Sequence, residues 1–479
     1  MATNICLRCL TRPSPSLRPL RPLHPVGNAF STSTARAAKP AKSIPKKKSV
    51  NAAKGAARKG GAGAFSFKDR GQRQLANSAN RKDPAALKAM RKRIVLSNTN
   101  ALEVEGLREL TADNATQIGE ILTLNNDSID ALRAAEAFKH NQGWNMFRRP
   151  STLVTQHAHE LASIVNTITT DKTSRKEFIT GERGSGKSVL ALQAKAYAFQ
   201  KGWAVIHIPE GQDLSISHTT YAPLRSGTTT LYTQPEYLSS LLARISKSSP
   251  ILANLSLSQK HSLPIPIQSN ISLARLCDLG ASDPSISHPI FEALLTELLT
   301  PSTETHPRPP LLFSLDCFPH VARKTSYLDP TNQPIHGFDL TLVRTFIDLL
   351  RGTTPLPNGG LILALDSGNN RPSSPALDFS IASALQRQAQ PDQTTGSKTP
   401  FLNPYVPFDA RVTEALKEVH VRNLEGLSKE ETKGMMEYYA RSGILRAAVD
   451  ERAVSEAWTL GGSGTIGEIE GAMTRLRVL

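Results

Sequence analysis

Residues 181–188 read GERGSGKS, which fits the phosphate-binding loop (P-loop) pattern of glycine, four residues, then glycine, lysine and serine or threonine. In such a loop, backbone N–H groups surround phosphate oxygens, and the following helix N-terminus favours the negative charge. Lys187 would reach the β and γ phosphates, and the Ser188 hydroxyl would ligate magnesium. The motif leaves open whether the chain hydrolyses a nucleotide or only holds it. The predicted binding residues are Gly181, Glu182, Arg183, Gly184, Ser185, Gly186, Lys187 and Ser188.

Asp316 is the second predicted metal ligand. It ends the apolar run LLFSLD, where a P-loop protein places the carboxylate that holds the magnesium shell. An aspartate that only begins a turn is the alternative. The next residue is Cys317, whereas motor ATPases of the AAA type usually carry glutamate there to activate water. We therefore predict magnesium at Ser188 and Asp316, no catalytic residue, and slow or no hydrolysis.

A second apolar run, LILALDSGN, also ends in polar residues. Asp366, Ser367 or Asn369 could lie near the γ-phosphate as a polar sensor. A strand that runs into an Asp-Ser-Gly turn explains the same residues equally well. The chain has no N-K-x-D stretch of the kind that small GTPases use for guanine. The pattern therefore does not choose between guanine and adenine.

The elements around the loop have the order that a P-loop requires. KEFITG and WAVIHIPEG are apolar strands, and KSVLALQAKAYAFQKG between them is a helix that ends at Gly202. LLFSLD and LILALD add two buried strands, and FDLTLVRTFIDLLRG between them is a helix that ends at Gly352. We predict an α/β P-loop NTPase fold with a mainly parallel sheet flanked by helices.

The composition divides the chain into five regions. They are a mitochondrial transit peptide at 1–30, a basic disordered extension at 31–83, mixed helix and loop at 84–164, the P-loop domain at 165–408, and a C-terminal helical lid at 409–479. In the lid, Ser428 and Glu431 have the spacing of a capping box, and Gly443 would end that helix. Polar insertions are predicted to form surface loops at about 246–288, 301–310 and 369–407.

Positive charge is concentrated at the N-terminus. Residues 1–68 contain 14 Lys and Arg and no Asp or Glu, which leaves only +2 of the net +16 for the remaining chain. The first 30 residues are rich in Arg and Ser and lack a continuous apolar core, which favours import into the mitochondrial matrix over secretion. A basic tail that is never cleaved is the alternative. In the extension after it, ten basic residues lie between Ser31 and Lys68 with no acidic residue among them, so we predict contact with RNA.

Three further features of the sequence are weaker evidence about function. Cys6 and Cys9 have C-x-x-C spacing, but they lie in the predicted transit peptide and no second ligand pair follows. The two remaining cysteines are too few for a disulfide framework, which is consistent with a reduced compartment. No apolar run approaches the length needed to span a bilayer, so we predict no membrane span.

Two other sets of residues could be mistaken for sites. GGSGTIG near the C-terminus contains G-x-G-x-x-G at Gly462, Gly464 and Gly467, but no strand precedes it, so we predict a helix boundary. His207 and His320 lie beside apolar strands, and we predict that they are packed or hydrogen-bonded rather than ligands.

Together these stretches resemble the death-associated protein family of the mitochondrial small ribosomal subunit, a GTP-binding ribosomal component with an AAA-like fold. The resemblance rests on GERGSGKS, GWAVIHIPEG, LYTQPEYLSSLL, FRRPSTLV and EGLSKEETKGMMEYYARSGIL, and covers about residue 140 to the C-terminus. It implies GTP or GDP, with ATP also open, held by Gly184 to Ser188 with Asp316 at Mg²⁺. It also implies assembly with mitochondrial small-subunit rRNA and neighbouring mitochondrial ribosomal proteins. The long polar insertions and Cys317 depart from the family pattern.

Three functions are therefore compared. The first is a structural ribosomal protein in which a bound purine nucleotide stabilises the fold and supports mitochondrial translation. The second is a mitochondrial AAA-type ATPase acting on RNA or protein, which would need a water-activating carboxylate and an arginine supplied in trans, and neither can be placed. The third is a small-molecule kinase, which leaves the basic N-terminus unexplained.

Overall fold

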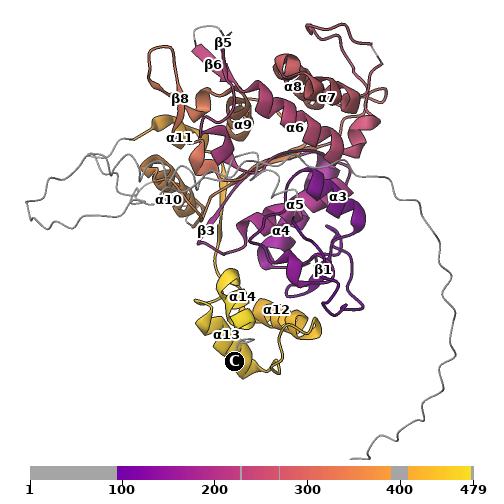
Figure 1. Cartoon of the computed structure of the whole chain (residues 1–479), viewed down its shortest axis with the longest axis vertical. Coiled ribbons are helices and arrows are strands. Elements are labelled where there is room, and N and C mark those ends of the chain that lie inside the picture. The colour runs from indigo at the N-terminus through magenta and orange to yellow at the C-terminus, as the bar shows by residue number, and fades with distance from the viewer. Residues whose placement is uncertain (1–93, 227–228, 269, 390–407, 476–479) are drawn as a thin grey trace, which may run out of the picture. The chain divides into compact units, whose positions relative to one another are not determined.

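The computed structural model describes residues 94–226, 229–268, 270–389 and 408–475 (Figure 1). The chain divides into two units, Met1–Arg73 and Gln74–Leu479, and every described residue belongs to the second. The predicted transit peptide, the basic extension and the Cys6 and Cys9 pair lie outside the described residues. No helix in the described part is long and apolar enough to cross a membrane.

A five-stranded parallel sheet lies at the centre of the described unit, in the order β11-β3-β10-β7-β4. The strands are β3 (Ser174–Gly181), β4 (Ala204–Ile208), β7 (Leu311–Leu315), β10 (Gly360–Leu365) and β11 (His420–Leu424). Because the strands are parallel and in close register, their carboxyl ends meet at one edge, where open α/β sheets bind ligands. Ile179 pairs with Leu365 and Leu315 with Ala364, which brings the Gly181–Ser188 loop and Asp316 to this edge.

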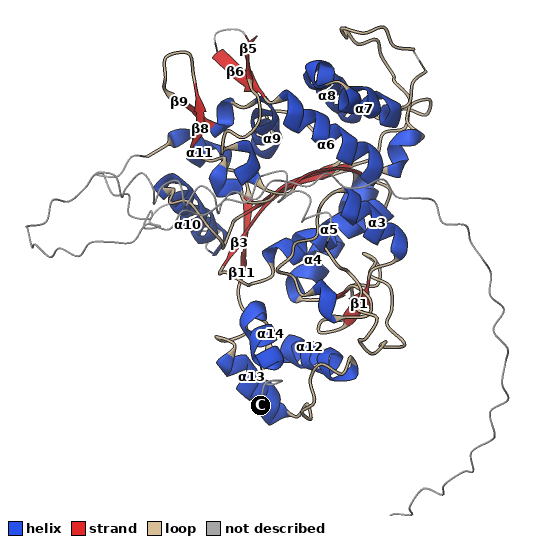
Figure 2. Cartoon of the chain, in the orientation of Figure 1, coloured by secondary structure: helices blue, strands red, loops and turns tan. Residues whose placement is uncertain are grey.

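The strands read as continuous apolar runs because both faces of the sheet are buried. Alternate residues point to opposite faces, so Phe178 belongs to one core and Ile179 to the other. Helices α3 (Asn126–Ala134), α4 (Gln156–Asp171) and α5 (Lys187–Gln200) form the layer on the Ile179 side. Figure 2 shows the sheet edge-on between this layer and the helices on its other face.

Six helices form the layer on the Phe178 side of the sheet. They are α6 (Pro235–Ser248), α7 (Leu273–Ser282), α8 (Ser287–Leu299), α9 (Thr341–Arg351), α10 (Pro375–Ala389) and α11 (Ala410–Ala415). The predicted helix stop at Gly352 is confirmed, because this residue caps α9 with a φ of 83°.

Three short antiparallel pairs lie outside the main sheet. The first is β1 (Ile121–Thr123) with β2 (Ser151–Leu153), the second β5 (Ala222–Ser226) with β6 (Thr229–Thr233), and the third β8 (Lys324–Leu328) with β9 (Pro334–His336). The first pair matters for the site because β2 leads into α4 beside the Gly181–Ser188 loop.

The C-terminal helices have a hydrophobic core of their own, to which Phe147 also contributes. They are α12 (Lys429–Arg441), α13 (Glu451–Leu460) and α14 (Ile466–Arg475). The predicted capping box is confirmed, since the Ser428 side chain accepts from the Glu431 N–H and the Glu431 carboxylate accepts from the Ser428 N–H. Gly443, just past the end of α12, has the positive φ of 74° expected there.

The prediction of an α/β fold with a parallel sheet flanked by helices is confirmed, but two local predictions are wrong. The region 409–479 is not all helical, because His420–Leu424 forms β11 at the sheet edge beside β3. The polar insertions are not all loops, since 246–288 contains α7 and 369–407 contains α10. In α7, Leu273, Leu276 and Cys277 pack at helical spacing in the core, a signal that the surrounding serines and prolines obscured.

Candidate nucleotide-binding site

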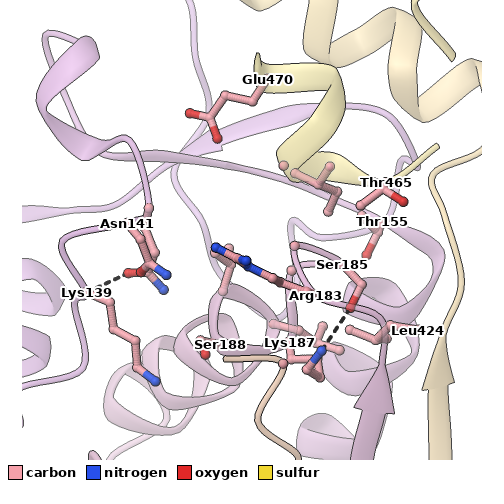
Figure 3. Close-up of a pocket in the computed structure, with 18 of the residues that line it drawn as sticks. Lys139, Asn141, Thr155, Arg183, Ser185, Lys187, Ser188, Leu424, Thr465 and Glu470 are labelled. Carbon is pink, nitrogen blue, oxygen red and sulfur yellow. Dashed lines mark hydrogen bonds between the residues drawn. The ribbon is translucent and has the colours of Figure 1, made fainter. Parts of the chain in front are cut away.

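A cavity of about 1480 Å³ opens at the carboxyl edge of the sheet. Its walls come from the Gly181–Ser188 loop, the ends of β7 and β10, the residues at 151–157 that precede and begin α4, and the C-terminal helices. Its volume is ample for a nucleotide, since pockets for small ligands usually enclose several hundred cubic ångströms. Figure 3 shows side chains of the loop, Thr155 and the C-terminal residues Thr465 and Glu470 around this cavity.

The loop is built on glycines that the backbone requires. Gly186 has a φ of 92° and begins α5, so the helix N-terminus points into the cavity. Gly181 has a φ of 146°, and a Cβ there would lie 2.5 Å from the carbonyl oxygen of Leu424. The edge strand β11 therefore approaches the loop closely only because this residue lacks a side chain.

Lys187 is the buried cation of the loop, with 6% of its surface exposed. Its Nζ donates to the carbonyl oxygens of Gly181 at 2.7 Å and of Glu182 at 2.6 Å. Burial lowers the pKa of Lys187, while the carboxylates of Asp366 and Asp316 oppose that shift. The loop thus holds a positive charge beneath its own backbone, as phosphate binding requires.

Ser188 and Asp316, the two predicted metal ligands, do come together. Ser188 Oγ donates to Asp316 Oδ2 at 3.0 Å, although the two residues are 128 positions apart. Asp316 is 4% exposed, and its Oδ1 accepts from the N–H of Cys317 at 2.8 Å. A serine hydroxyl beside an aspartate carboxylate is a suitable donor pair for magnesium, which takes its remaining ligands from phosphate and water.

A lysine that the sequence did not reveal also contacts Asp316. The Nζ of Lys139, from the loop after α3, forms an ion pair with Asp316 Oδ2, the same oxygen that accepts from Ser188. Burial by itself raises the pKa of Asp316, but the charge and hydrogen bond of Lys139 outweigh it and hold the pKa below its usual value. Magnesium would therefore have to compete with an ammonium group for this carboxylate.

A second missed lysine lies beneath the site in α5. Lys195 is 2% exposed, and burial lowers its pKa to about 7. Its Nζ lies 3.5 Å from Nε2 of His207, whose Nδ1 is 2.7 Å from Ser314 Oγ. The prediction that His207 is a packed, hydrogen-bonded histidine is confirmed. His320 is also buried, although it lines the cavity wall.

Asp366 directly follows β10, and its carboxylate accepts hydrogen bonds from two side chains. Its Oδ2 accepts from Thr180 Oγ1 at 3.0 Å, and its Oδ1 accepts from Arg371 Nε at 2.9 Å. Ser367 and Asn369 line the cavity, so the predicted sensor residues lie at its wall. Arg371 was missed because nothing in its local sequence distinguishes it from a loop arginine.

The C-terminal helices contact the glycine-rich loop directly. The N–H of Gly467 donates to the carbonyl oxygen of Gly184 at 3.0 Å, and Cδ1 of Ile466 lies 2.8 Å from where a Cβ on Gly186 would stand. The prediction that GGSGTIG is a helix boundary is confirmed, because it joins α13 to α14. Its proximity to the Gly181–Ser188 loop was missed, since a turn of this composition has no sequence signal for its partner.

Glu470, one turn after Ile466 in α14, extends its carboxylate into the same cavity (Figure 3). Its Oε1 packs against Gly143, where a Cβ would lie 2.3 Å from this oxygen. Burial raises the pKa of Glu470, and a hydrogen bond with Tyr439 opposes that shift. The spacing of four residues from Ile466 puts both side chains on one face of the helix.

The remaining residues singled out in the sequence have the following positions. Arg183 and Ser185 line the cavity with the rest of the loop. Cys277 and Cys317 are free thiols and are buried. Among the described residues, no group of three or more acidic, histidine or cysteine side chains is placed to hold a metal ion by itself.

Comparisons with known proteins agree with the resemblance that the motifs suggested. A sequence model of the mitochondrial ribosomal death-associated protein 3 family matches residues 152–472. A Neurospora crassa protein named small ribosomal subunit protein mS29 is 38% identical over 481 aligned residues, covering 98% of each chain. A Schizosaccharomyces pombe protein of the same name is 26% identical and covers 65% of this chain and 62% of its own length. By the extent of these matches, the chain belongs to the mitochondrial ribosomal death-associated protein 3 family.

Proposed function

We propose that this chain is a structural component of the mitochondrial small ribosomal subunit, in the mitochondrial matrix, and that a purine nucleotide in its cavity stabilises the fold for assembly. The family membership and the full-length relative named as a small-subunit protein support the ribosomal part of the proposal. The basic segment at 31–83 would supply charge for contact with small-subunit rRNA. Membership of the small subunit would also bring contacts with neighbouring mitochondrial ribosomal proteins.

The proposal that a nucleotide binds here rests on one observation, which is that two separate parts of the chain form the walls of the cavity. One wall is the loop at the N-terminus of α5, and the facing wall is the start of α14, which touches that loop through Gly467 and Ile466. A ligand bound in this cavity would contact both the loop and the C-terminal helices. We therefore assign the loop as a P-loop of an AAA-like NTPase fold whose nucleotide joins the sheet to the C-terminal helices.

The phosphates would bind the backbone of the Gly181–Ser188 loop, with Lys187 beside them and Ser188 and Asp316 on the cation side. A magnesium ion bound there would offset part of the phosphate charge, and it would share Asp316 with Lys139. We propose guanine as the base, as GTP or GDP, because the Glu470 carboxylate can accept from both the N1–H and the N2 amino group of guanine. Adenine offers no such paired donors on that edge.

The side chains at Asp316 and Cys317 favour binding of the nucleotide over its hydrolysis. Burial raises the pKa of Cys317 to about 11, so its thiol stays protonated at neutral pH and cannot accept a proton from water. Both oxygens of Asp316 already accept hydrogen bonds or an ion pair. A bound nucleotide still contributes stability, about 2.7 kcal/mol at a hundred times its dissociation constant.

Sedimentation of a mitochondrial lysate through a high-salt gradient tests the ribosomal assignment. High salt releases factors held mainly by phosphate contacts, while integral ribosomal proteins remain bound. We expect the mature protein to sediment with small-subunit rRNA. A protein that stays at the top of the gradient would overturn the assignment and favour the ATPase instead.

A further inference from the structure

The position of Lys139 is fixed by its surroundings. Its backbone N–H donates to Gln142 Oε1 at 2.7 Å, and Trp144 Nε1 donates to the same oxygen at 2.7 Å. The neighbouring Phe138 ring meets Trp144 edge-to-face, with centroids 5.3 Å apart. The segment is therefore anchored on both sides of Lys139, which limits the freedom of its backbone.

From this anchored segment the Lys139 side chain reaches toward the Ser188 hydroxyl (Figure 3). Ser188 and Lys139 contact the same oxygen of Asp316, and all three residues line the cavity. In a P-loop, a magnesium ion stands between the serine hydroxyl, this carboxylate and the β and γ phosphates. The ammonium group of Lys139 lies where that ion would make its contacts with the protein.

We propose that Lys139 is a built-in cation for the nucleotide phosphates, so that this chain binds a nucleoside diphosphate or triphosphate with little dependence on magnesium. The inference rests on the proposed nucleotide binding. An ammonium has three donors and no acceptor, so it can hold Asp316 and donate to a phosphate oxygen as well.

A magnesium ion would add little binding free energy at this position. To reach Asp316 it must separate an ion pair whose carboxylate is buried, and breaking such a pair leaves an uncompensated charge. Magnesium also sheds its own hydration reluctantly. The phosphate charge is already offset by Lys139 and Lys187, so the extra attraction that the ion offers is reduced.

The test is a titration of GDP into the purified full-length chain by calorimetry, once with magnesium and once with EDTA. For the unaltered chain we expect the dissociation constants to differ by less than about threefold. In Lys139→Met, Asp316 is free to hold the ion, so we expect affinity to fall about tenfold or more in EDTA and to recover largely with magnesium. Thermal unfolding in the presence of GDP gives a second readout. It is measured for the unaltered chain and for Lys139→Met, each with magnesium and with EDTA.

Lys201→Met is the matched control, because Lys201 also pairs with an aspartate, Asp113, but at the surface away from the cavity. We expect it to bind GDP as the unaltered chain does. A tenfold loss of affinity on adding EDTA to the unaltered chain overturns the inference, even if Lys139→Met does not fold. No GDP binding with or without magnesium overturns the proposed nucleotide function itself, and the inference with it.

Discussion

The N–H of Gly467 donates to the carbonyl oxygen of Gly184 at 3.0 Å, across 283 positions of sequence, and so joins α14 to the glycine-rich loop. Beside this bond, Ile466 packs against the position of Gly186. A Cβ on Gly184 would stand 3.5 Å from Cα of Gly467, and one on Gly467 would stand 3.4 Å from Cα of Gly184, so the two backbones lie within van der Waals reach of each other. The start of α14 is therefore held to this loop by a hydrogen bond and an apolar contact.

Gly186→Ala should destabilise the protein by about 1–3 kcal/mol, mainly because it forces an L-residue to a φ of 92°; the new methyl group would also stand 2.8 Å from Cδ1 at the end of the Ile466 side chain, which would have to shift. Gly202→Ala is the control, since Gly202 has a φ of 70° but open space around its Cβ position. It should cost only about 1 kcal/mol. Urea unfolding measures both, and equal costs would show that the contact with Ile466 is unimportant.

Lys187→Ala should lower affinity for GDP about tenfold or more and reduce the amount of assembled small subunit in cells. The reason is that Lys187 is the buried cation of the loop, with its Nζ bonded to the loop carbonyl oxygen of Gly181, and its charge would attract the phosphates of the proposed nucleotide. Calorimetry measures the affinity, and gradient profiles measure assembly. Normal subunit levels together with unchanged thermal stability in the presence of GDP would contradict a stabilising role for the nucleotide.

Lys195→Met should stabilise the protein at neutral pH by up to a few kcal/mol and flatten its pH dependence. The pKa of Lys195 is lowered from 10.5 when unfolded to about 7 when folded, so between those values the unfolded state binds more protons and stability rises with pH. Below pH 7 the cost of burying the charge near Lys139 is fully present, with Asp316 offsetting part of it. Unfolding measured from pH 6 to about 10 would show the slope in the unaltered chain and its loss in the variant.

Arg422→Met should cost about 3 kcal/mol, because Arg422 holds β11 to the sheet through a buried pair with Glu177. Its Nε donates to Glu177 Oε2 at 3.2 Å, and the variant leaves that carboxylate buried beside His420 alone. The double variant with Glu177→Gln should recover much of the loss. Arg344→Met, which breaks an exposed pair with Asp348, should cost under about 1 kcal/mol in the same unfolding assay.

The purified protein should hydrolyse GTP and ATP very slowly, because the residue after Asp316 is a neutral thiol and not a carboxylate. A phosphate-release assay over many turnovers measures this. Steady hydrolysis that Asp316→Ala abolishes would instead support the mitochondrial ATPase.

Much of the fold was predictable because parallel strands buried on both faces are uniformly apolar and their helices end at glycines. The four strands around the loop were found in this way. The strand β11 was not, because HVRNL is short and three of its five residues are polar, and it forms a strand by pairing with the edge of β3. Likewise α7 lies among serines and prolines that hide its apolar face.

By itself, the sequence determined the residues of the loop, the aspartate at the end of β7, the α/β class and the family. These depend on local spacing, which one stretch of chain carries. The tertiary structure alone decided that Lys139 pairs with Asp316 across 177 positions, that Glu470 enters the cavity and that Gly467 bonds to Gly184. Such contacts are set by how helices pack against the sheet, and a single sequence contains no periodic signal for which distant residues that packing brings together.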